Sequence, residues 1–164
     1  MTRLLLLDAL KEFTELTLAE LILPVRMQEG DAEQQFRAPT VFLMRLPDST
    51  AATKKAPYII HQVITAKDWQ PEGEKTKSTA VVRSIFCVYC DDEQEGAKSL
   101  LNCMERLRIA LMKSCVIGQF ELDLEEGIET LIYTEDSAPY FAGEMVTTWH
   151  MPSVRREVRE LYGI

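Results

Sequence analysis

The chain has 164 residues, of which 46% are hydrophobic and 27% charged, and its formal net charge is −8 at pH 7. This composition is typical of one globular domain, and the acidic balance argues against broad binding to nucleic-acid phosphates, which requires clustered Lys and Arg. No apolar run approaches the roughly 18 residues that span a bilayer, and Asp8 and Lys11 interrupt the leucine-rich N-terminus too early for a signal peptide. We therefore expect a protein made and kept in a cytoplasm.

The N-terminal stretch predicts a helix followed by a polar connection. Residues 3–22 carry apolar side chains at helical spacing, and Pro24 ends the pattern. Residues 26–38 are polar and irregular, with room for a short extended piece. The side of the helix that we expect to face the core consists of Leu6, Ala9, Leu10, Phe13 and Leu16.

Three strands are predicted next, because β-branched and aromatic residues dominate residues 40–46, 58–66 and 79–89. Nearly continuous apolar character predicts that residues 58–66 are covered on both faces. The charged residues 67–78 contain Pro and Gly, and they predict a long connection between two antiparallel strands. Residues 49–56 predict an exposed loop tip.

The chain is organised around a helix predicted over residues 91–115. Four acidic residues occur in its first five positions, where the positive end of the helix dipole favours negative charge. Gly118 supplies a stop signal after it. The predicted core side consists of Leu100, Met104, Leu107 and Leu111.

The C-terminal part returns to strand patterns. Residues 120–124 predict a short strand, residues 127–133 a better one, and residues 140–151 the last one. Gly143 within the last strand predicts a bulge. Residues 152–164 predict a C-terminal arm or a short helix.

These elements together predict an α+β fold: a mostly antiparallel sheet with two main helices packed on one face, as a two-layer sandwich. Neither internal repeats nor linkers interrupt the pattern, so residues 1–164 are predicted to form a single domain.

The four cysteines include Cys87 and Cys90, which form a CxxC pair. Residues three apart in a strand point to opposite faces, so these thiols should diverge. Cys103 and Cys115 form no second close pair, and zinc needs four convergent ligands. We interpret the cysteines as small buried residues, with redox or metal chemistry as the alternatives.

No catalytic or cofactor-binding motif is found. The GxSxG, GxxxxGK[ST] and GxGxxG patterns do not occur. His61 and His150 are interpreted as structural histidines, since no partner motif accompanies either of them. The acidic residues near position 125 lack EF-hand spacing and are interpreted as a solvated surface. The sequence thus predicts no catalytic, cofactor or metal site and no enzyme.

The central and C-terminal segments resemble a known family. A strand ends in Val88-Tyr89 before an acidic run, a helix carries the pattern LxxxERLRxAL from Leu101 to Leu111, and a closing strand reads GEMxTTW from Gly143 to Trp149. This combination resembles the tail terminator, or tail completion, proteins of long-tailed phages and prophages, over roughly residues 57–152.

The resemblance implies a sheet flanked by helices, assembled as a closed homo-oligomeric ring, usually of six copies. Such a ring caps the tail tube, stops its polymerisation and joins the tail to the head connector, in the neck of a virion assembled in the host cytoplasm. DNA passes through its channel without sequence-specific binding. The family has no catalytic residues to transfer.

Two sets of residues are the candidates for contacts in such a ring. The charged connection is the candidate contact with the tail tube, and Trp69 within it is equally compatible with local packing. An acidic channel wall lets phosphates pass, which suits the net charge. The predicted tube-contact residues are Lys67, Trp69, Glu72, Lys75 and Lys77. The predicted channel-lining residues are Asp91, Asp92, Glu121, Asp123 and Glu125.

Three alternatives stay open at this point: another ring of the phage neck that closes or joins the head, a thiol-dependent enzyme that uses Cys87 and Cys90, and a monomeric binding module unrelated to phage.

Overall fold

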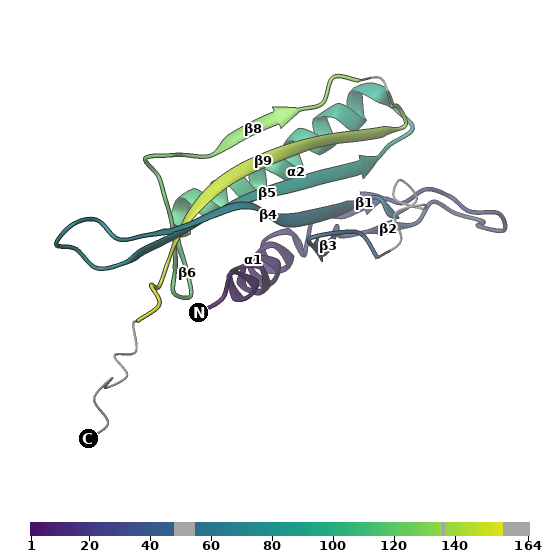
Figure 1. The fold of residues 1–164 in the computed structure, drawn as a ribbon. Coiled ribbons are helices and arrows are strands. Elements are labelled where there is room, and N and C mark those ends of the chain that lie inside the picture. Colours follow the sequence, from purple (N-terminus) through teal and green to yellow (C-terminus); the bar gives the residue numbers. More distant parts are fainter. Residues whose placement is uncertain (48–54, 136, 156–164) are drawn as a thin grey trace.

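A computed structural model of the protein describes residues 1–47, 55–135 and 137–155. The fold is α+β, with two helices, a large curled mixed sheet of seven strands and a small second sheet (Figure 1). The helices are α1 (Arg3–Leu18) and α2 (Glu93–Ser114). The strands are β1 (Leu23–Pro24), β2 (Phe36–Arg37), β3 (Thr40–Leu43), β4 (Tyr58–Trp69), β5 (Lys77–Tyr89), β6 (Val116–Ile117), β7 (Phe120–Leu122), β8 (Glu129–Ile132) and β9 (Tyr140–Met151).

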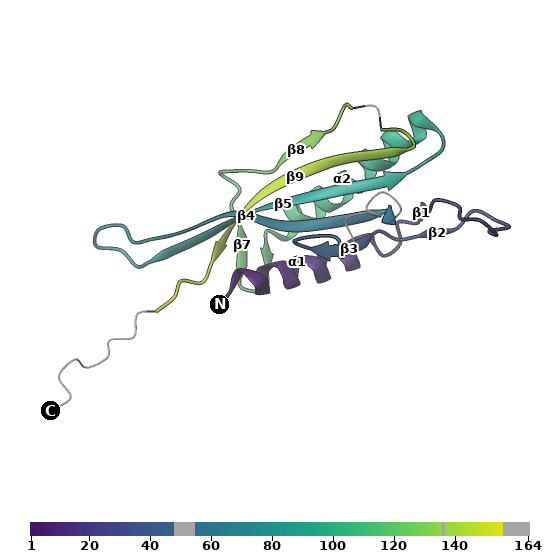
Figure 2. The same ribbon diagram turned by 45° about the vertical axis from the view of Figure 1, so that its right-hand side comes forward.

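The large sheet has the strand order β3-β4-β5-β9-β7-β6, and β8 pairs with β9 beside β7. Strand β3 runs parallel to β4, and the other strand pairs of this sheet are antiparallel. Strands β1 and β2 form the small sheet. Figures 1 and 2 show that the β4–β5 hairpin projects at one end of the molecule and the loop between β1 and β2 at the other.

Helix α1 confirms the predicted N-terminal helix but ends at Leu18. The Thr2 hydroxyl caps its start by accepting the Leu5 N–H. The prediction that Leu16 faces the core was wrong, since its side chain is 74% exposed. The buried stripe instead repeats every four residues and reaches Thr14, a polar residue that the apolar pattern does not reveal.

Helix α2 confirms the central helix. The Asp92 carboxylate caps it by accepting the Glu95 N–H at 3.0 Å. Gly96 lies in the first turn where the helix crosses β9, and a Cβ there would overlap the Phe141 ring. A glycine at this position therefore sets how closely the helix approaches the sheet.

Strands β4 and β5 are longer than predicted, because strand pairing continues through Trp69 and Lys77 and only residues 70–76 form the connection. The first four residues of β4 are buried, but the strand is exposed from Ile64 to Asp68. The prediction that both faces of this strand are covered is therefore confirmed only for its first third. The pairing shifts register between Val63 and Thr65. Such a bulge increases the local twist where the hairpin leaves the body.

The C-terminal strands lie within or on the predicted ranges, and β9 has the predicted bounds. The bulge predicted at Gly143 was wrong, because β5 and β9 pair without a shift there. A Cβ on Gly143 would lie 2.9 Å from the Leu131 carbonyl oxygen and 3.0 Å from Met104 Sδ, so close packing explains this glycine. Residues 152–155 form no helix or strand, and the rest of the predicted arm lies outside the described residues.

The main core lies between the helices and one face of the sheet. Its members come from both helices and from alternate residues of the central strands, among them Leu10, Met104, Phe86 and Trp149. A smaller cluster on the opposite face contains Tyr58, Ile60, Cys87 and Tyr89. Within the described residues, neither helix is long and apolar enough to cross a membrane.

Candidate functional site

The predicted tube-contact residues lie on the projecting β4–β5 hairpin (Figures 1 and 2). Lys67 Nζ lies 5.2 Å from the centre of the Trp69 ring, a cation–π arrangement that covers part of the indole. Lys77 forms an ion pair of 2.8 Å with Glu74. Trp69 is thus half-buried by packing within its own hairpin, while Lys67, Lys77, Glu72 and Lys75 are exposed.

Contacts with α1 brace the base of this hairpin. Arg3 forms an ion pair with Asp68 at 2.9 Å, and the same nitrogen donates to the Ser78 hydroxyl and the Thr79 carbonyl at 3.3 Å each. Hydrogen bonding by Ser78 and by Arg3 lowers the pKa of Asp68. The start of the first helix therefore contacts both strands of the hairpin where they leave the body.

The predicted channel residues fall into two groups at opposite ends of β9. Asp91 and Asp92 follow β5, whose Tyr89 pairs with Tyr140 at the start of β9. Asp123 hydrogen-bonds with His150, near the other end. At about 3.3 Å per residue the ends of β9 are separated by roughly 35 Å. Both groups can line one channel only if β9 runs along its axis.

Several of these acids have local structural roles. Asp91 accepts the Tyr89 hydroxyl at 2.6 Å, and Asp92 is the cap of α2. Asp123 accepts the N–H groups of Glu125 and Glu126 at 3.0 Å each. These backbone hydrogen bonds, the one from Glu126 first, and the contact with His150 lower the pKa of Asp123.

Glu121 and Glu125, in contrast, are exposed with their carboxylates in none of these contacts. Glu121 is level with His150 in the pairing of β7 and β9. Among the ten predicted contact residues, the exposed ones that take part in none of the contacts given above are Glu72, Lys75, Glu121 and Glu125. Their exposure fits a surface role.

One hollow brings members of the two predicted sets together. It encloses about 640 Å³ on the sheet face that no helix covers, between the hairpin and the Asp123 turn. Lys67 and Trp69 line one side of it, and Asp123 and His150 line the other. His150 and Asp123 hydrogen-bond at 2.8 Å, which joins β9 to the turn after β7 on that side of the hollow.

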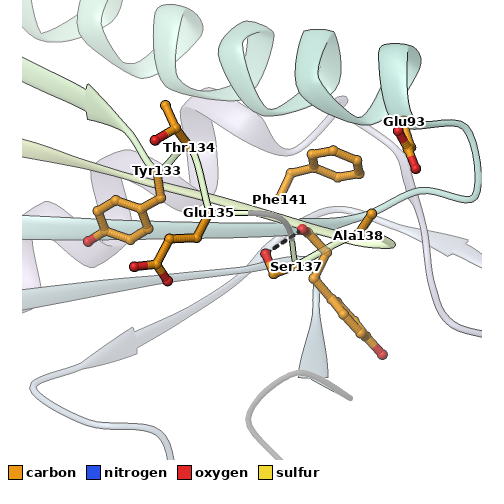
Figure 3. A pocket seen from close by; sticks show the side chains of 8 residues that line it. Glu93, Tyr133, Thr134, Glu135, Ser137, Ala138 and Phe141 are labelled. Carbon is orange, nitrogen blue, oxygen red and sulfur yellow. Dashed lines mark hydrogen bonds between the residues drawn. The ribbon is translucent and has the colours of Figure 1, made fainter.

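A second hollow, of about 270 Å³, lies beside the N-terminus of α2 (Figure 3). Glu93 and Glu135 are part of its lining, and the Ser137 hydroxyl closes one side by donating to the Tyr140 carbonyl. The hollow carries the carboxylate of Glu93 in the first turn of α2 and that of Glu135, and negative charge in the lining disfavours a bound phosphate.

Burial holds the titratable groups of the core in their neutral forms. His61 is fully buried and hydrogen-bonds with the Thr14 hydroxyl at 2.8 Å and the Ser84 hydroxyl at 2.7 Å, and burial lowers its pKa to about 4. Burial raises the pKa of Cys87 to about 11 and that of Cys103 to about 12, which keeps both as neutral thiols. All the cysteines are free, and in the part of the chain that the structure describes no group of His, Cys, Asp or Glu is arranged to hold a metal.

The sequence did not reveal a polar row that crosses the helix-free face of the sheet. Arg83 donates to the Gln62 side-chain oxygen at 3.1 Å and lies 3.8 Å from Glu144, and Gln62 donates to the Met44 carbonyl at 2.8 Å. The row joins β4, β5 and β9 to the end of β3. The alternation of polar and apolar residues in β5 and β9 was the available signal, although it does not show which strands are neighbours.

No protein-family model matches the sequence, and a search of curated protein sequences finds no match.

Proposed function

We propose that this chain is a tail terminator of a long-tailed phage or prophage, a structural protein whose ring caps the tail tube, stops its polymerisation and offers a surface to the head connector. Its partners are then five further copies of itself, the tail-tube protein and the connector, and it acts in the virion neck without catalysis. DNA passes through the ring. The finer fold prediction belongs to this proposal: a mostly antiparallel sheet with both helices on one face, as a two-layer sandwich.

The observation that carries the proposal is the braced, projecting hairpin. The residues predicted to meet the tube lie on an extension of two strands of the main sheet rather than on the body. The contact of Arg3 with Asp68 and Ser78 holds its base. A projecting arm with exposed charge and one partly exposed tryptophan is suited to reach a neighbouring protein.

The charge distribution supports the channel part of the proposal. A net charge of −8 per copy sums over a ring into a field that repels phosphates. With β9 along the ring axis, Asp91 and Asp92 lie toward one rim, and Glu121 and Glu125 toward the other. Acidic rims at both ends keep DNA from adhering at entry and exit.

The neighbouring role in the neck, a ring that closes or joins the head, uses the same kinds of surface. Binding to the tail-tube protein rather than to the connector separates the two roles. The thiol-dependent alternative has less support, since Cys87 is buried and its pKa is raised to about 11, whereas a reactive cysteine needs an accessible thiolate.

The test mixes the purified protein with its cognate tail tubes and images them by electron microscopy. The intact chain should form a cap at one tube end and stop further growth. Replacing residues 70–76 by Asn-Gly joins Trp69 to Lys77 in the register that they already have. This variant, combined with Trp69→Ser, should fold normally but fail to cap.

A matched control shortens residues 27–30, the loop at the opposite end of the molecule. It removes a similar length of exposed chain and should leave capping intact. If the hairpin variant still caps the tubes, the hairpin is not the contact with the tube. If the intact chain leaves the tubes uncapped, the protein is not a tail terminator.

A further inference from the structure

Strand β8 is an open edge of the large sheet. Among the described residues it pairs only with β9, on one of its two sides. All four of its residues are exposed, and the apolar side chains are 55% exposed at Leu131 and 38% exposed at Ile132. In Figures 1 and 2, β8 lies along the upper border of the molecule. An exposed apolar edge strand offers unpaired backbone groups to another chain.

The backbone groups that point outward from β8 belong to Thr130 and Ile132. Tyr133 donates its N–H to the Ala142 carbonyl of β9 at 3.0 Å. Alternation in the antiparallel ladder then directs the backbone groups of Leu131 toward β9 and those of Thr130 and Ile132 away from it. This is the arrangement to which an extended peptide adds as a further strand.

The side chains of β8 alternate between the two faces of the sheet. Leu131 pairs with Glu144 of β9, which lies on the helix-free face near Arg83. Residues directly opposite each other in a ladder share a face, and successive residues alternate. Glu129 and Leu131 therefore project on the helix-free side.

The chain just beyond β8 continues this alternation. Figure 3 shows Tyr133 and Glu135 projecting to one side of the backbone and Thr134 to the other. Burial raises the pKa of Tyr133, and the nearby carboxylate of Glu144 raises it further, so the phenol lies on the helix-free side. One side of this edge thus carries, in order, an acidic, an apolar, an aromatic and an acidic residue: Glu129, Leu131, Tyr133 and Glu135.

A hollow lies at each end of this edge. One encloses about 400 Å³ over β8 and β9, with Glu129 and Glu144 in its lining. The other is the hollow of about 270 Å³ beside α2, with Glu93 and Glu135 in its lining. Neither lining contains Lys or Arg. A long basic side chain placed in either hollow would therefore meet carboxylates.

Charge distinguishes a second copy from a different partner. Two copies of β8 could pair antiparallel about Leu131, so that the outward groups of Thr130 and Ile132 meet. That pairing sets Glu129 of one copy diagonally opposite Glu135 of the other, about 7–8 Å away, at both ends of the contact. Like charges at both ends disfavour self-pairing, whereas a basic segment brings opposite charges to the same places.

We propose that β8 binds an extended segment of a partner protein as an additional antiparallel strand, and that this segment carries a basic residue at each end of an apolar middle. Its side chains opposite Glu129 and Glu135 are Lys or Arg, and those opposite Leu131 and Tyr133 are apolar. The antiparallel direction is chosen because that ladder is slightly more stable per residue. The inference goes beyond the proposed function and does not depend on it, since the whole site lies within one copy.

A synthetic peptide tests the site on the intact chain. The probe is acetyl-Lys-Thr-Val-Thr-Val-Thr-Lys-amide, whose two lysines are spaced as Glu129 and Glu135 are in sequence. Titration into ¹⁵N-labelled protein at low salt should shift the amide resonances of Thr130 and Ile132. It should also slow the hydrogen exchange of these amides, because their N–H groups gain acceptors. Added salt should weaken the binding, since exposed charges are screened.

Two control peptides separate backbone pairing from charge. Replacing the central threonine by proline keeps the charges but removes the N–H that would face the Ile132 carbonyl, so this peptide should not bind. Replacing both lysines by glutamates keeps the strand pattern but turns two attractive pairs into repulsive ones. That peptide should bind about tenfold more weakly.

Variants of the chain locate the site. Thr130→Pro removes an outward N–H without breaking the β8–β9 ladder, so it should fold but lose the peptide. Glu129→Gln should weaken binding by about twofold to fivefold, the size of one exposed ion pair. The matched control is Glu72→Gln, which neutralises an exposed acid on the hairpin and should leave binding unchanged. If circular dichroism shows that Thr130→Pro does not fold, the comparison of the two glutamine variants decides.

Three results would overturn the proposal. The first is the absence of shifts at Thr130 and Ile132, and the second is equal binding by the proline peptide. The third is self-association of the free chain in sedimentation that Thr130→Pro abolishes, because a second copy would then occupy the edge.

Discussion

The two faces of β5 differ although they belong to one strand. Val82, Ser84 and Phe86 point toward the helices and are buried, whereas Arg83 and Ile85 between them lie half-exposed on a face that no helix covers. The first face is filled by side chains of this chain alone. On the second face, hydrogen-bonding and apolar side chains remain partly exposed to solvent. Stability should therefore depend on the first face, and assembly on the second face and the sheet edges.

The strongest test of this comparison replaces Trp149, which is fully buried on the helix side and donates its indole N–H to the Thr147 hydroxyl at 2.9 Å. Trp149→Ala should reduce the free energy of unfolding by about 3–5 kcal/mol, because it leaves a large cavity. Its neighbour Thr148 points to the open face, and Thr148→Ala should cost less than about 1 kcal/mol. Urea unfolding followed by circular dichroism measures both, and similar losses would refute the division between the faces.

Acid should lower the free energy of unfolding, because His61 is buried on the helix side of the sheet. Its pKa is about 4 in the folded chain and about 6.5 in an unfolded one, so the unfolded chain binds the proton more tightly. Stability is then fully present above pH 6.5 and falls as the pH drops from about 6.5 to about 4, by roughly 3 kcal/mol in total. The lowered pKa values of Asp68, Asp123 and Glu105 act at the acid end of this window and below it.

Unfolding free energies measured across this pH range should show that slope. His61→Gln should flatten it, whereas His150→Gln, which leaves the buried imidazole in place, should retain it. A flat profile in the intact chain would mean that the helix side admits water and that His61 is not sealed between Thr14 and Ser84.

Close packing of α2 on β9 gives the next effect. Gly96→Ala places a methyl group into the Phe141 ring, so the helix or the ring must move, at a cost of about 1–3 kcal/mol. Phe141→Leu in the same chain vacates that space and should recover part of the loss. Additive effects of the two changes, measured in a double-mutant cycle, would show that the two residues do not compete for one space.

Much of the fold was predictable from local patterns. The acidic start and apolar stripe located α2, and the alternation in residues 140–151 located β9 to the residue. The error at Leu16 arose because Thr14 occupies a core position by bonding to His61, a partner 47 residues away. The length of the hairpin was missed because charged residues hide strand pairing when both faces are exposed.

The candidate surface was less predictable, because it depends on which strands are neighbours. Sequence patterns pointed to the hairpin and to two acidic groups as candidates. They did not show that Lys67 and Asp123 line one hollow. They also did not show that Asp91 and Asp123 lie at opposite ends of β9.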